Sequence, residues 1–459
     1  MSDAHGPARR DRIGLWEAVA IAVGTMIGAS IFSIFGLGAR LAGPNLPLVF
    51  VLSGGLAYLV AYSYAHLGAR IVSDAGPMEY ILRAFGDSHL TGTLAILMWF
   101  SYAISIALFA KGFAGYFLPL VGLDDGNALA LGIAEVGVVA LFTALNFFGS
   151  KAVGRAEFYI VLVKLGVLGL FVVVGIWTVD PGRIAPVFDA RYTQGLLYGI
   201  AVFFLSYMGF GLVTNASEHM EDPRRNVPRA IYISIAVVAL VYVSVAVVAV
   251  GNLPLSELVR AEDYALAEAA RPFLGQWGYL LVSLGALFSI ASALNATLYG
   301  GANVAYALAR DGQLPRAFER KVWFGAPEGL YITAATSLAF ALFLDLGGVA
   351  SVTSAVFILI YLFVIASHYT LRDLVGGRRG LIVFSFFAVT VVFGVLLAYQ
   401  WRSDRAAFHA TWMVLAGAGL VEWLWRGLTR RRLQRRGRRL GAQPETSSST
   451  GAASPSSSR

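Results

Sequence analysis

The residue best placed to do chemistry in this sequence is a lysine inside a long apolar run. Lys164 lies in residues 158–167, which hold no other charged side chain, nine positions beyond Arg155. On a helix that rises about 1.5 Å per residue, Lys164 would lie about 13 Å from Arg155, near the middle of a hydrocarbon layer about 30 Å thick. A charge at that depth costs from a few to more than about 10 kcal/mol, so an ionisable residue there is a functional hypothesis by default.

Lys164 has two interpretations. In the first, it binds main-chain carbonyl groups and releases its proton near neutral pH, because burial disfavours the charged form of a lysine. In the second, it is a structural lysine whose ammonium group holds such carbonyls permanently. Snorkelling to a membrane surface is disfavoured so far from either end of the run. We favour the first interpretation, in which Lys164 is a proton carrier.

A second candidate is an interruption in the first apolar run, which covers residues 15–41. Its middle, residues 24–32, contains two glycines, a threonine and a serine. Backbone groups inside lipid must satisfy their own hydrogen bonds, so a broken helix is tolerated where it faces protein or a watery cavity. The interruption therefore predicts either a binding site at a helix break or close helix packing through small residues.

The groups that such a break frees suit an amino acid zwitterion. The backbone N–H groups of Gly28, Ala29 and Ser30 would begin the second half-helix and attract a carboxylate. The carbonyl groups of Met26 and Ile27 would accept hydrogen bonds from an ammonium group.

A second break supports the binding site. Residues 202–211 again place serine and glycine near the centre of an apolar run, in the sixth of the predicted membrane spans. Spans one and six are five apart, so two halves of five helices would have opposite orientations in the membrane. Paired interruptions of this kind indicate the binding site of a transporter.

Composition places the chain in a membrane. It has 459 residues, 58% hydrophobic and 14% charged, whereas about 25% of residues are charged in soluble domains. A cleavable signal peptide is not expected, because residues 1–12 are polar and the first apolar run is too long. The chain has no cysteine, which excludes disulfides and thiolate metal sites. Metalloprotease, serine-hydrolase, P-loop and kinase motifs are missing, so we expect no enzyme, metal or cofactor.

The net charge of +8 is concentrated near the C-terminus, where residues 430–439 hold seven arginines. A juxtamembrane anchor for anionic lipid explains this cluster better than a nucleic-acid surface. Residues 440–459 are rich in Ser, Ala, Gly and Pro, and we expect them to be disordered.

Twelve membrane spans are predicted, and their even number puts both termini on one side. Segments on that side hold 26 of the 35 Lys and Arg residues, the opposite loops hold seven, and Lys111 and Lys164 lie within spans. By the positive-inside rule both termini of this multi-pass protein are cytoplasmic, and the expected location is the plasma membrane. The predicted spans are 14–41, 47–72, 89–117, 128–149, 155–178, 193–217, 229–251, 276–308, 329–346, 348–371, 379–400 and 406–427.

Four stretches give the sequence a family resemblance. They are residues 24–32, residues 203–211, the loop 218–229, and residues 76–86 with their Gly-Pro-Met-Glu-Tyr and Ala-Phe-Gly segments. Over residues 13–400 the chain resembles the amino acid–polyamine–organocation (APC) superfamily, and within it most closely the archaeal proton-dependent amino-acid transporters.

The resemblance implies an all-α integral membrane protein with the LeuT-type fold. That fold has twelve transmembrane helices: two inverted repeats of five, with helices 1 and 6 broken, plus two extra C-terminal helices. The implied division of the chain is a cytoplasmic tail 1–12, a first repeat 13–178, a second repeat 179–372, the last two helices 373–427, and a basic then disordered cytoplasmic tail 428–459.

The resemblance also implies roles at the sixth span. The carbonyl groups of Phe204 and Tyr207 would add acceptors for the substrate ammonium, and the Phe204 ring would be a lid over the substrate. Ordinary packing is the alternative for Phe204. One sodium site of the sodium-coupled relatives would fall at Ile31 and Leu205, which are apolar and cannot coordinate a hard cation.

The other sodium site of those relatives uses carbonyls of span 1 and hydroxyls of span 8. Here the matching groups are the carbonyls of Gly24 and Ile27 and the hydroxyl of Ser289, and the Lys164 ammonium would take the place of the ion. The resemblance therefore implies proton coupling through Lys164, Gly24 and Ser289, with no metal.

We therefore expect a secondary active transporter that imports amino acids with protons, without sodium, by alternating access. Its partners would be a small-molecule amino acid, the proton and the lipid bilayer, and not a nucleic acid. One alternative is an exchanger of amino acids or amines with the same fold. A channel-like or ligand-sensing membrane protein is the other, although no span carries the polar stripe that a channel pore needs.

Two further charges lie at membrane depth. Lys111 and Glu135 are each about eight residues from the loop that joins spans 3 and 4, as their sequence positions give. Equal depth predicts an ion pair with a structural role. Residues 255–272 carry four acidic side chains and are expected to form a short surface helix on the side opposite the termini.

Overall fold

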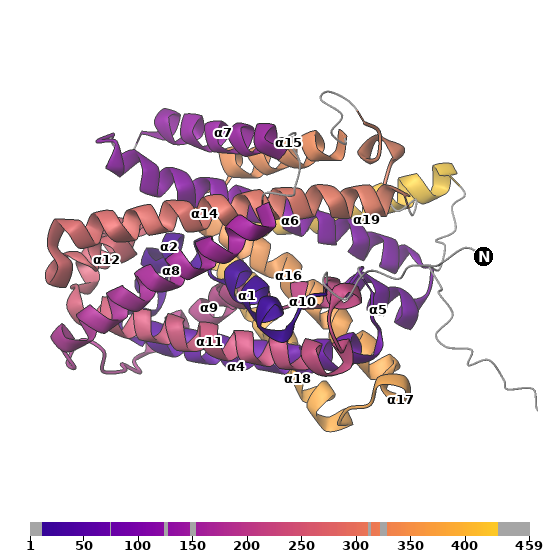
Figure 1. Ribbon diagram of the computed structural model, residues 1–459, viewed down its shortest axis with the longest axis horizontal. Helices are drawn as coiled ribbons and strands as arrows, with labels where there is room; N and C mark the ends of the chain where they lie inside the picture. The colour runs from indigo at the N-terminus through magenta and orange to yellow at the C-terminus, as the bar shows by residue number, and fades with distance from the viewer. Residues whose placement is uncertain are drawn as a thin grey trace, which may run out of the picture.

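The computed structural model describes residues 12–73, 75–123, 127–146, 153–310, 314–321 and 328–429, and in these residues the secondary structure is helical. Eleven of their helical stretches are long and apolar enough to cross a membrane. The remaining predicted span is α15 (Glu328–Phe343), with 16 residues. The helices form one bundle (Figure 1), which confirms the predicted all-α membrane protein. Most of the predicted N-terminal tail and the arginine-rich C-terminal tail lie outside the described residues.

The twelve spans follow one another in chain order. Spans 1 to 5 are α1 (Leu15–Met26) with α2 (Ala29–Ser33) and α3 (Phe35–Ala42), α4 (Leu46–Arg70), α6 (His89–Leu120), α7 (Ala128–Leu145) and α8 (Val153–Gly175). Spans 6 to 10 are α9 (Ala190–Phe203) with a 3₁₀ turn (Phe204–Tyr207) and α10 (Leu212–Asn215), α11 (Pro223–Asn252), α14 (Arg271–Arg310), α15, and α16 (Leu346–Thr370). Spans 11 and 12 are α18 (Arg379–Ser403) and α19 (Arg405–Thr429).

Both predicted breaks are present. In span 1, α1 ends at Met26, the backbone leaves the helical region at Ile27 (ψ 68°) and Gly28 (ψ −130°), and α2 begins at Ala29. In span 6, the helix tightens into the 3₁₀ turn after Phe203 and is interrupted before α10. The small and polar residues of these stretches thus mark helix interruptions, as the sequence predicts.

A glycine lets the two breaks approach each other. A Cβ atom at Gly209 would lie 2.9 Å from the backbone nitrogen of Met26 and 3.2 Å from the carbonyl carbon of Thr25. Any side chain at this position would push the broken segment of span 6 away from that of span 1. The contact brings backbone groups of both interruptions to one place in the bundle.

Short surface helices occupy matching positions in the two halves. The helix α5 (Pro77–Phe85) lies between spans 2 and 3, and α12 (Leu255–Ala261) with α13 (Ala265–Glu268) lies between spans 7 and 8. Each half thus begins with a broken span that four further spans follow. In each half the short surface helices come after the second of its five spans. This order agrees with two repeats of five helices.

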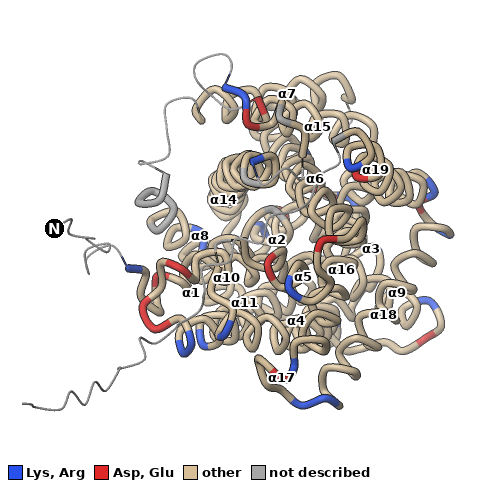
Figure 2. Tube along the Cα trace, turned by 90° about the vertical axis from the view of Figure 1, so that its right-hand side faces the viewer, with Lys and Arg blue, Asp and Glu red and all other residues tan. Residues whose placement is uncertain are grey.

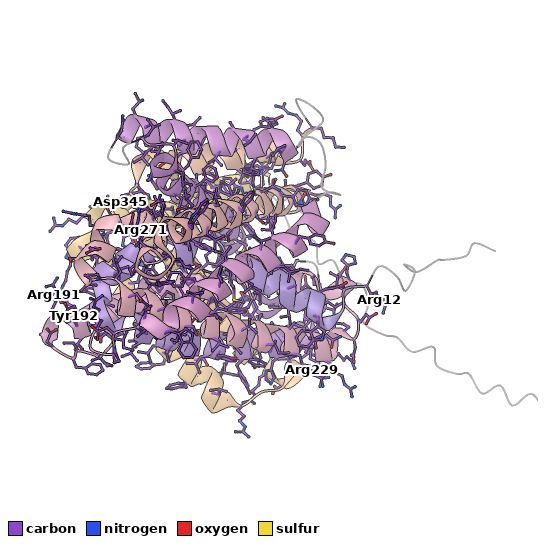
Figure 3. All side chains as sticks on the ribbon, turned by 60° about the vertical axis from the view of Figure 1, so that its left-hand side comes forward. Arg12, Arg191, Tyr192, Arg229, Arg271 and Asp345 are labelled. Atoms are coloured by element: carbon purple, nitrogen blue, oxygen red, sulfur yellow. The ribbon has the colours of Figure 1, made fainter. Side chains whose placement is uncertain are left out.

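The two ends of the bundle differ in which loops they carry. Arg12 and Arg229 lie at one end, and Arg191, Arg271 and Asp345 lie at the other (Figure 3). We call the first the termini end and the second the opposite end. In the end-on view most of the trace is uncharged, and charged residues form separate short segments (Figure 2).

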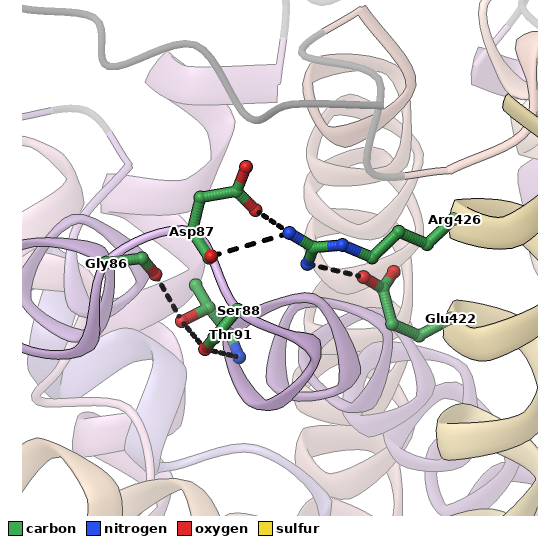
Figure 4. A network of polar contacts seen from close by, with 6 residues as sticks. All are labelled: Gly86, Asp87, Ser88, Thr91, Glu422 and Arg426. Carbon is green, nitrogen blue, oxygen red and sulfur yellow. Dashed lines mark hydrogen bonds and ion pairs between the residues drawn. The ribbon is translucent and has the colours of Figure 1, made fainter. Parts of the chain in front are cut away.

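Span 12 is tied to the beginning of span 3 at the termini end. The Arg426 guanidinium donates to Asp87 Oδ1 at 2.8 Å and lies 3.5 Å from Glu422 Oε1 (Figure 4). A Cβ atom at Gly92 would lie 2.1 Å from the carboxyl carbon of Glu422, so the glycine makes room for this buried carboxylate. The ion pair with Asp87 holds α19 against the beginning of α6, and the pair with Glu422 lies within α19.

Candidate functional site

A cavity of about 110 Å³ lies at the two helix breaks. Residues of span 1 and of span 6 form one side of it, and α6, α14 and α16, with single residues of α4 and α5, contribute the rest. Pro77 and Asn215 also contribute to its lining, so the cavity extends from the breaks toward the termini end. The interrupted segments of spans 1 and 6 therefore form part of the cavity wall.

The described residues that line this cavity include no Asp, Glu, Lys or Arg. Its polar groups are hydroxyls and one amide, and three methionines give it flexible apolar surface. The hydroxyl and amide side chains belong to Thr25, Ser30, Tyr64, Tyr102, Ser105, Asn215, Thr297 and Tyr361, and the methionines are Met26, Met98 and Met208. Such a lining accommodates uncharged groups, because a charged one would lose its hydration without a partner.

The break in span 1 frees carbonyl groups that three side chains from three other spans bind. Lys164 Nζ on α8 donates to the Gly24 carbonyl oxygen at 2.6 Å. Ser289 Oγ on α14 donates to the Ile27 carbonyl oxygen at 3.0 Å. These two bonds cross-link spans 5 and 8 to span 1 at the depth of the break.

The third bond comes from Tyr242 on α11. Its hydroxyl donates to the Met26 carbonyl oxygen at 2.5 Å and lies 3.3 Å from the carbonyl oxygen of Ser206. Tyr242 is fully buried, and its ring packs against Phe50 and Tyr207. Sequence reasoning missed this residue, because a tyrosine in an apolar span is most simply explained by packing.

The predicted substrate-binding residues of span 1 differ in whether they line the cavity or lie next to it. Met26, Gly28 and Ser30 line it. Ile27 is buried beside it and is bonded through its carbonyl to Ser289. Ala29 begins α2 next to these residues.

The predicted residues of span 6 lie behind the cavity wall. The Phe204 ring is fully buried and packs on Tyr361, with ring centroids 5.7 Å apart, while Tyr361 itself lines the cavity. The Tyr207 hydroxyl donates to the Phe50 carbonyl oxygen at 2.8 Å. The wall at span 6 is made instead by Leu205, Met208, Gly209, Gly211 and Leu212.

The cavity is closed toward the opposite end. The Tyr116 hydroxyl donates to the Phe32 carbonyl oxygen at 3.0 Å, and their rings make an edge contact. Beyond them the segment after α12 packs on α3, where a Cβ atom at Gly36 would lie 2.3 Å from the carbonyl oxygen of Glu262. The predicted surface helix of residues 255–272 is thus present as α12 and α13, and it covers this end of span 1.

Toward the termini end, loops bind the two broken spans together. The backbone N–H of Ile13 donates to His219 at 2.8 Å, and that of Glu221 donates to Ile13 at 3.0 Å. Ser217 Oγ accepts from the backbone N–H of Ser73 at 3.1 Å. The beginning of span 1, the loop after span 2 and the end of span 6 therefore form one connected group.

The two other charges at membrane depth form the predicted ion pair. Lys111 Nζ lies 3.0 Å from Glu135 Oε1, and the two side chains are 16% and 3% exposed. Neither residue lines the cavity. The pair joins span 3 to span 4, away from the two breaks.

The spans that enclose a cavity at two helix breaks define a membrane transport protein. The chain belongs to the amino acid permease family, whose model matches residues 13–421. Members of this family transport amino acids or related substrates, and the chain is a transporter rather than an enzyme.

Relatives cover between 67% and 92% of the chain. An uncharacterized protein of Methanocaldococcus jannaschii is 59% identical over 92% of this chain and 97% of its own. The inner membrane transport protein YbaT of Escherichia coli is 31% identical over 88% of this chain and 94% of its own. The branched-chain amino acid permease BcaP of Bacillus subtilis is 24% identical over 67% of this chain and 69% of its own.

Proposed function

We propose that this protein imports neutral amino acids together with protons, independently of sodium, by alternating access. The observation that carries the proposal is the 2.6 Å hydrogen bond from Lys164 Nζ to the Gly24 carbonyl oxygen, at the break that lines the cavity. A titratable group bound to the backbone of the substrate site links the protonation of that group to the shape of the site.

The link works through the number of donors on the amine. A protonated lysine carries three donors and a positive charge, and it ties span 5 to the carbonyl end of α1. A neutral amine donates fewer hydrogen bonds and carries no charge, so its hold on span 1 is weaker. The two protonation states then favour different arrangements of span 1, which is the differential affinity that coupling requires.

The substrate main chain fits the break in span 1. The backbone N–H groups of Gly28, Ala29 and Ser30, at the beginning of α2, would hold the carboxylate, and Gly28 and Ser30 line the cavity. The carbonyl groups of Met26 and Ile27, with those of Phe204 and Tyr207, would accept from the ammonium. Phe204 would act on the substrate through Tyr361, on which its ring packs.

The substrate side chain would be uncharged. The described cavity lining offers hydroxyls, one amide, methionines and aromatic rings, and none of its side chains is acidic or basic. A charged substrate side chain would therefore be buried without a counter-ion, which is costly. This supports small and medium neutral amino acids as the preferred class.

Sodium independence is supported by the residues at the two positions that bind sodium in coupled relatives. At the first, the Lys164 amine donates to the Gly24 carbonyl oxygen, and Ser289 Oγ donates to the Ile27 carbonyl oxygen. Ile31 and Leu205 are buried apolar residues at the second. The carbonyl oxygens at the first position already accept from Lys164 and Ser289, and the side chains at the second position have no oxygen ligand for a hard cation.

The proposed orientation puts the termini end in the cytoplasm of the cell and the protein in the plasma membrane. The excess of Lys and Arg in the loops at that end supports it. The proposed repeats are residues 13–178 and 179–372, with residues 373–427 outside them, which agrees with the order of the helices.

Uptake into proteoliposomes tests the proposal. The purified protein is reconstituted with a defined lumen, and a panel of labelled L-amino acids is offered under an imposed pH gradient or an imposed sodium gradient. The expected result is accumulation of neutral amino acids driven by an alkaline lumen and unaffected by sodium. Counterflow without net accumulation would indicate an exchanger, and conductance without saturation would indicate a channel.

A further inference from the structure

Tyr242 connects the two helix breaks. Its hydroxyl is placed between a carbonyl of span 1, Met26 at 2.5 Å, and a carbonyl of span 6, Ser206 at 3.3 Å. One hydroxyl carries one proton, so it makes its strong bond to Met26 and has Ser206 within reach as a second acceptor.

The Met26 carbonyl has no capacity left for a ligand. It accepts from the backbone N–H of Gly28 at 2.9 Å as well as from the Tyr242 hydroxyl, and a carbonyl oxygen has two lone pairs. Its neighbours are bonded too, Gly24 to Lys164 and Ile27 to Ser289. A ligand ammonium that binds Met26 must therefore displace a donor. The Gly28 N–H is fixed in the backbone, whereas the Tyr242 hydroxyl can rotate.

We propose that the Tyr242 hydroxyl is a placeholder for the substrate ammonium. In the empty protein it satisfies the Met26 carbonyl, and when the substrate ammonium takes that carbonyl it turns to Ser206. This inference rests on the proposed function, because it takes an amino acid as the ligand. Tyr242 is thus a positioning residue. When its hydroxyl turns away, the Met26 carbonyl of span 1 can accept a hydrogen bond from the substrate.

The exchange leaves the Met26 carbonyl with the same number of donors in both states, and the Ser206 carbonyl gains the hydroxyl when the substrate is bound. The Gly28 N–H supplies the Met26 carbonyl with one donor, and in the absence of a ligand the Tyr242 hydroxyl supplies the second inside the membrane, where water cannot. A donor that binds too well would, however, compete with the ligand. When the hydroxyl donates to the Ser206 carbonyl instead, it no longer competes with the ligand for Met26. The same change couples ligand binding at span 1 to the hydrogen bonding of span 6.

The ring of Tyr242 is held independently of its hydroxyl. Its centroid lies 5.4 Å from that of Phe50 and 5.5 Å from that of Tyr207. Tyr242→Phe therefore removes the donor and leaves the packing in place. A matched control is Tyr58→Phe, since the Tyr58 hydroxyl donates to the carbonyl oxygen of Tyr232 on the same helix α11 at 2.9 Å, and neither residue lines the cavity.

The test measures stability and affinity in the same purified proteins. The thermal midpoint is recorded without ligand, and the dissociation constant is measured for the L-amino acid that the wild type binds best among the twenty standard ones. For Tyr242→Phe we expect a lower midpoint but tighter binding, by about 2- to 10-fold, because the competing donor is gone. For Tyr58→Phe we expect a lower midpoint with unchanged affinity.

Weaker or unchanged binding by folded Tyr242→Phe overturns the placeholder role. If the substitution prevents folding, 3-fluorotyrosine at position 242 supplies a more acidic hydroxyl and a stronger donor, and the expected result is weaker binding. Unchanged or tighter binding by that variant also overturns the inference. Failure of the folded wild type to bind any amino acid would instead refute the proposed function.

Discussion

Lys164 donates a hydrogen bond of 2.6 Å to the carbonyl oxygen of Gly24, a residue 140 positions earlier in the chain. The lysine is 1% exposed, and the carbonyl belongs to the last turns of α1 before the break. The bond fastens span 5 to the half-helix of span 1 that leads to the cavity. A change in the charge of the amine would therefore act directly on the proposed substrate site.

The first prediction follows from this bond. Lys164→Arg keeps a positive charge, but arginine does not release a proton at physiological pH, so we expect a folded protein that no longer accumulates amino acids against a pH gradient. Lys164→Ala should lose the same activity and can still bind substrate. The measurement is pH-driven uptake, with binding assayed separately in detergent.

A matched control for Lys164→Arg is Lys111→Arg. It makes the same replacement in a membrane span and keeps the ion pair with Glu135, away from the cavity. We expect this control to accumulate amino acids normally. Wild-type pH dependence in Lys164→Arg would show that another group carries the proton.

The two breaks and the need of Lys164 for buried acceptors could be anticipated from the sequence for a physical reason, whereas Gly24 as its partner was implied by the family resemblance. A charge in the middle of an apolar run and glycines in a membrane span are both costly, so each predicts a compensating structure nearby. The donor on Tyr242 could not be anticipated, because a tyrosine in a span costs little and its acceptor at Met26 is 216 residues away. The residues of span 6 that line the cavity could not be predicted either, because the 3₁₀ turn from Phe204 decides which side chains face the cavity.

The second prediction concerns Gly28, which lines the cavity. A Cβ atom there would lie 3.2 Å from the Cβ atom of Ala293 and 3.8 Å from the Phe109 ring, so a larger side chain must enter the cavity. We expect Gly28→Leu to weaken amino acid binding by more than about tenfold while the protein stays folded. Equilibrium binding on purified protein checks it, with Gly169→Leu as control, because a Cβ at Gly169 meets nothing within 4 Å. If Gly28→Leu bound amino acids with wild-type affinity, the substrate site would have to lie elsewhere in the protein.

The third prediction concerns closure at the opposite end. A Cβ atom at Gly36 would lie 2.3 Å from the backbone oxygen of Glu262, so Gly36→Ala would hold the loop after α12 away from α3. The proposed alternating access would need this closure, so we expect uptake to fall strongly while substrate binding persists. Uptake and binding are compared with those of Gly55→Ala, whose new Cβ atom has no neighbour within 4 Å. Normal turnover in Gly36→Ala would mean that this contact is not part of the transport cycle.

The fourth prediction fixes the orientation in the membrane. The native chain has no cysteine, so single cysteines can be introduced without background. Arg225 is exposed in the first turn of α11, and Glu257 is exposed on α12, beyond the other end of α11. An impermeant thiol reagent applied to intact cells should label Glu257→Cys and spare Arg225→Cys. The reverse labelling pattern would invert the proposed topology.

The fifth prediction compares the contribution of the buried ion pair to stability with that of an exposed ion pair. Glu135 is 3% exposed, so Glu135→Gln leaves the Lys111 ammonium without its counter-ion in the membrane and should destabilise the protein by about 3–5 kcal/mol. The double variant Lys111→Met with Glu135→Met should recover most of that loss, because it removes both charges. The exposed pair of Arg40 and Glu262, 52% and 59% exposed, is the control, and Arg40→Gln should cost less than about 1 kcal/mol. Stability is measured by unfolding in detergent. Equal stability of Glu135→Gln and the wild type would show that the membrane-embedded lysine does not depend on this carboxylate.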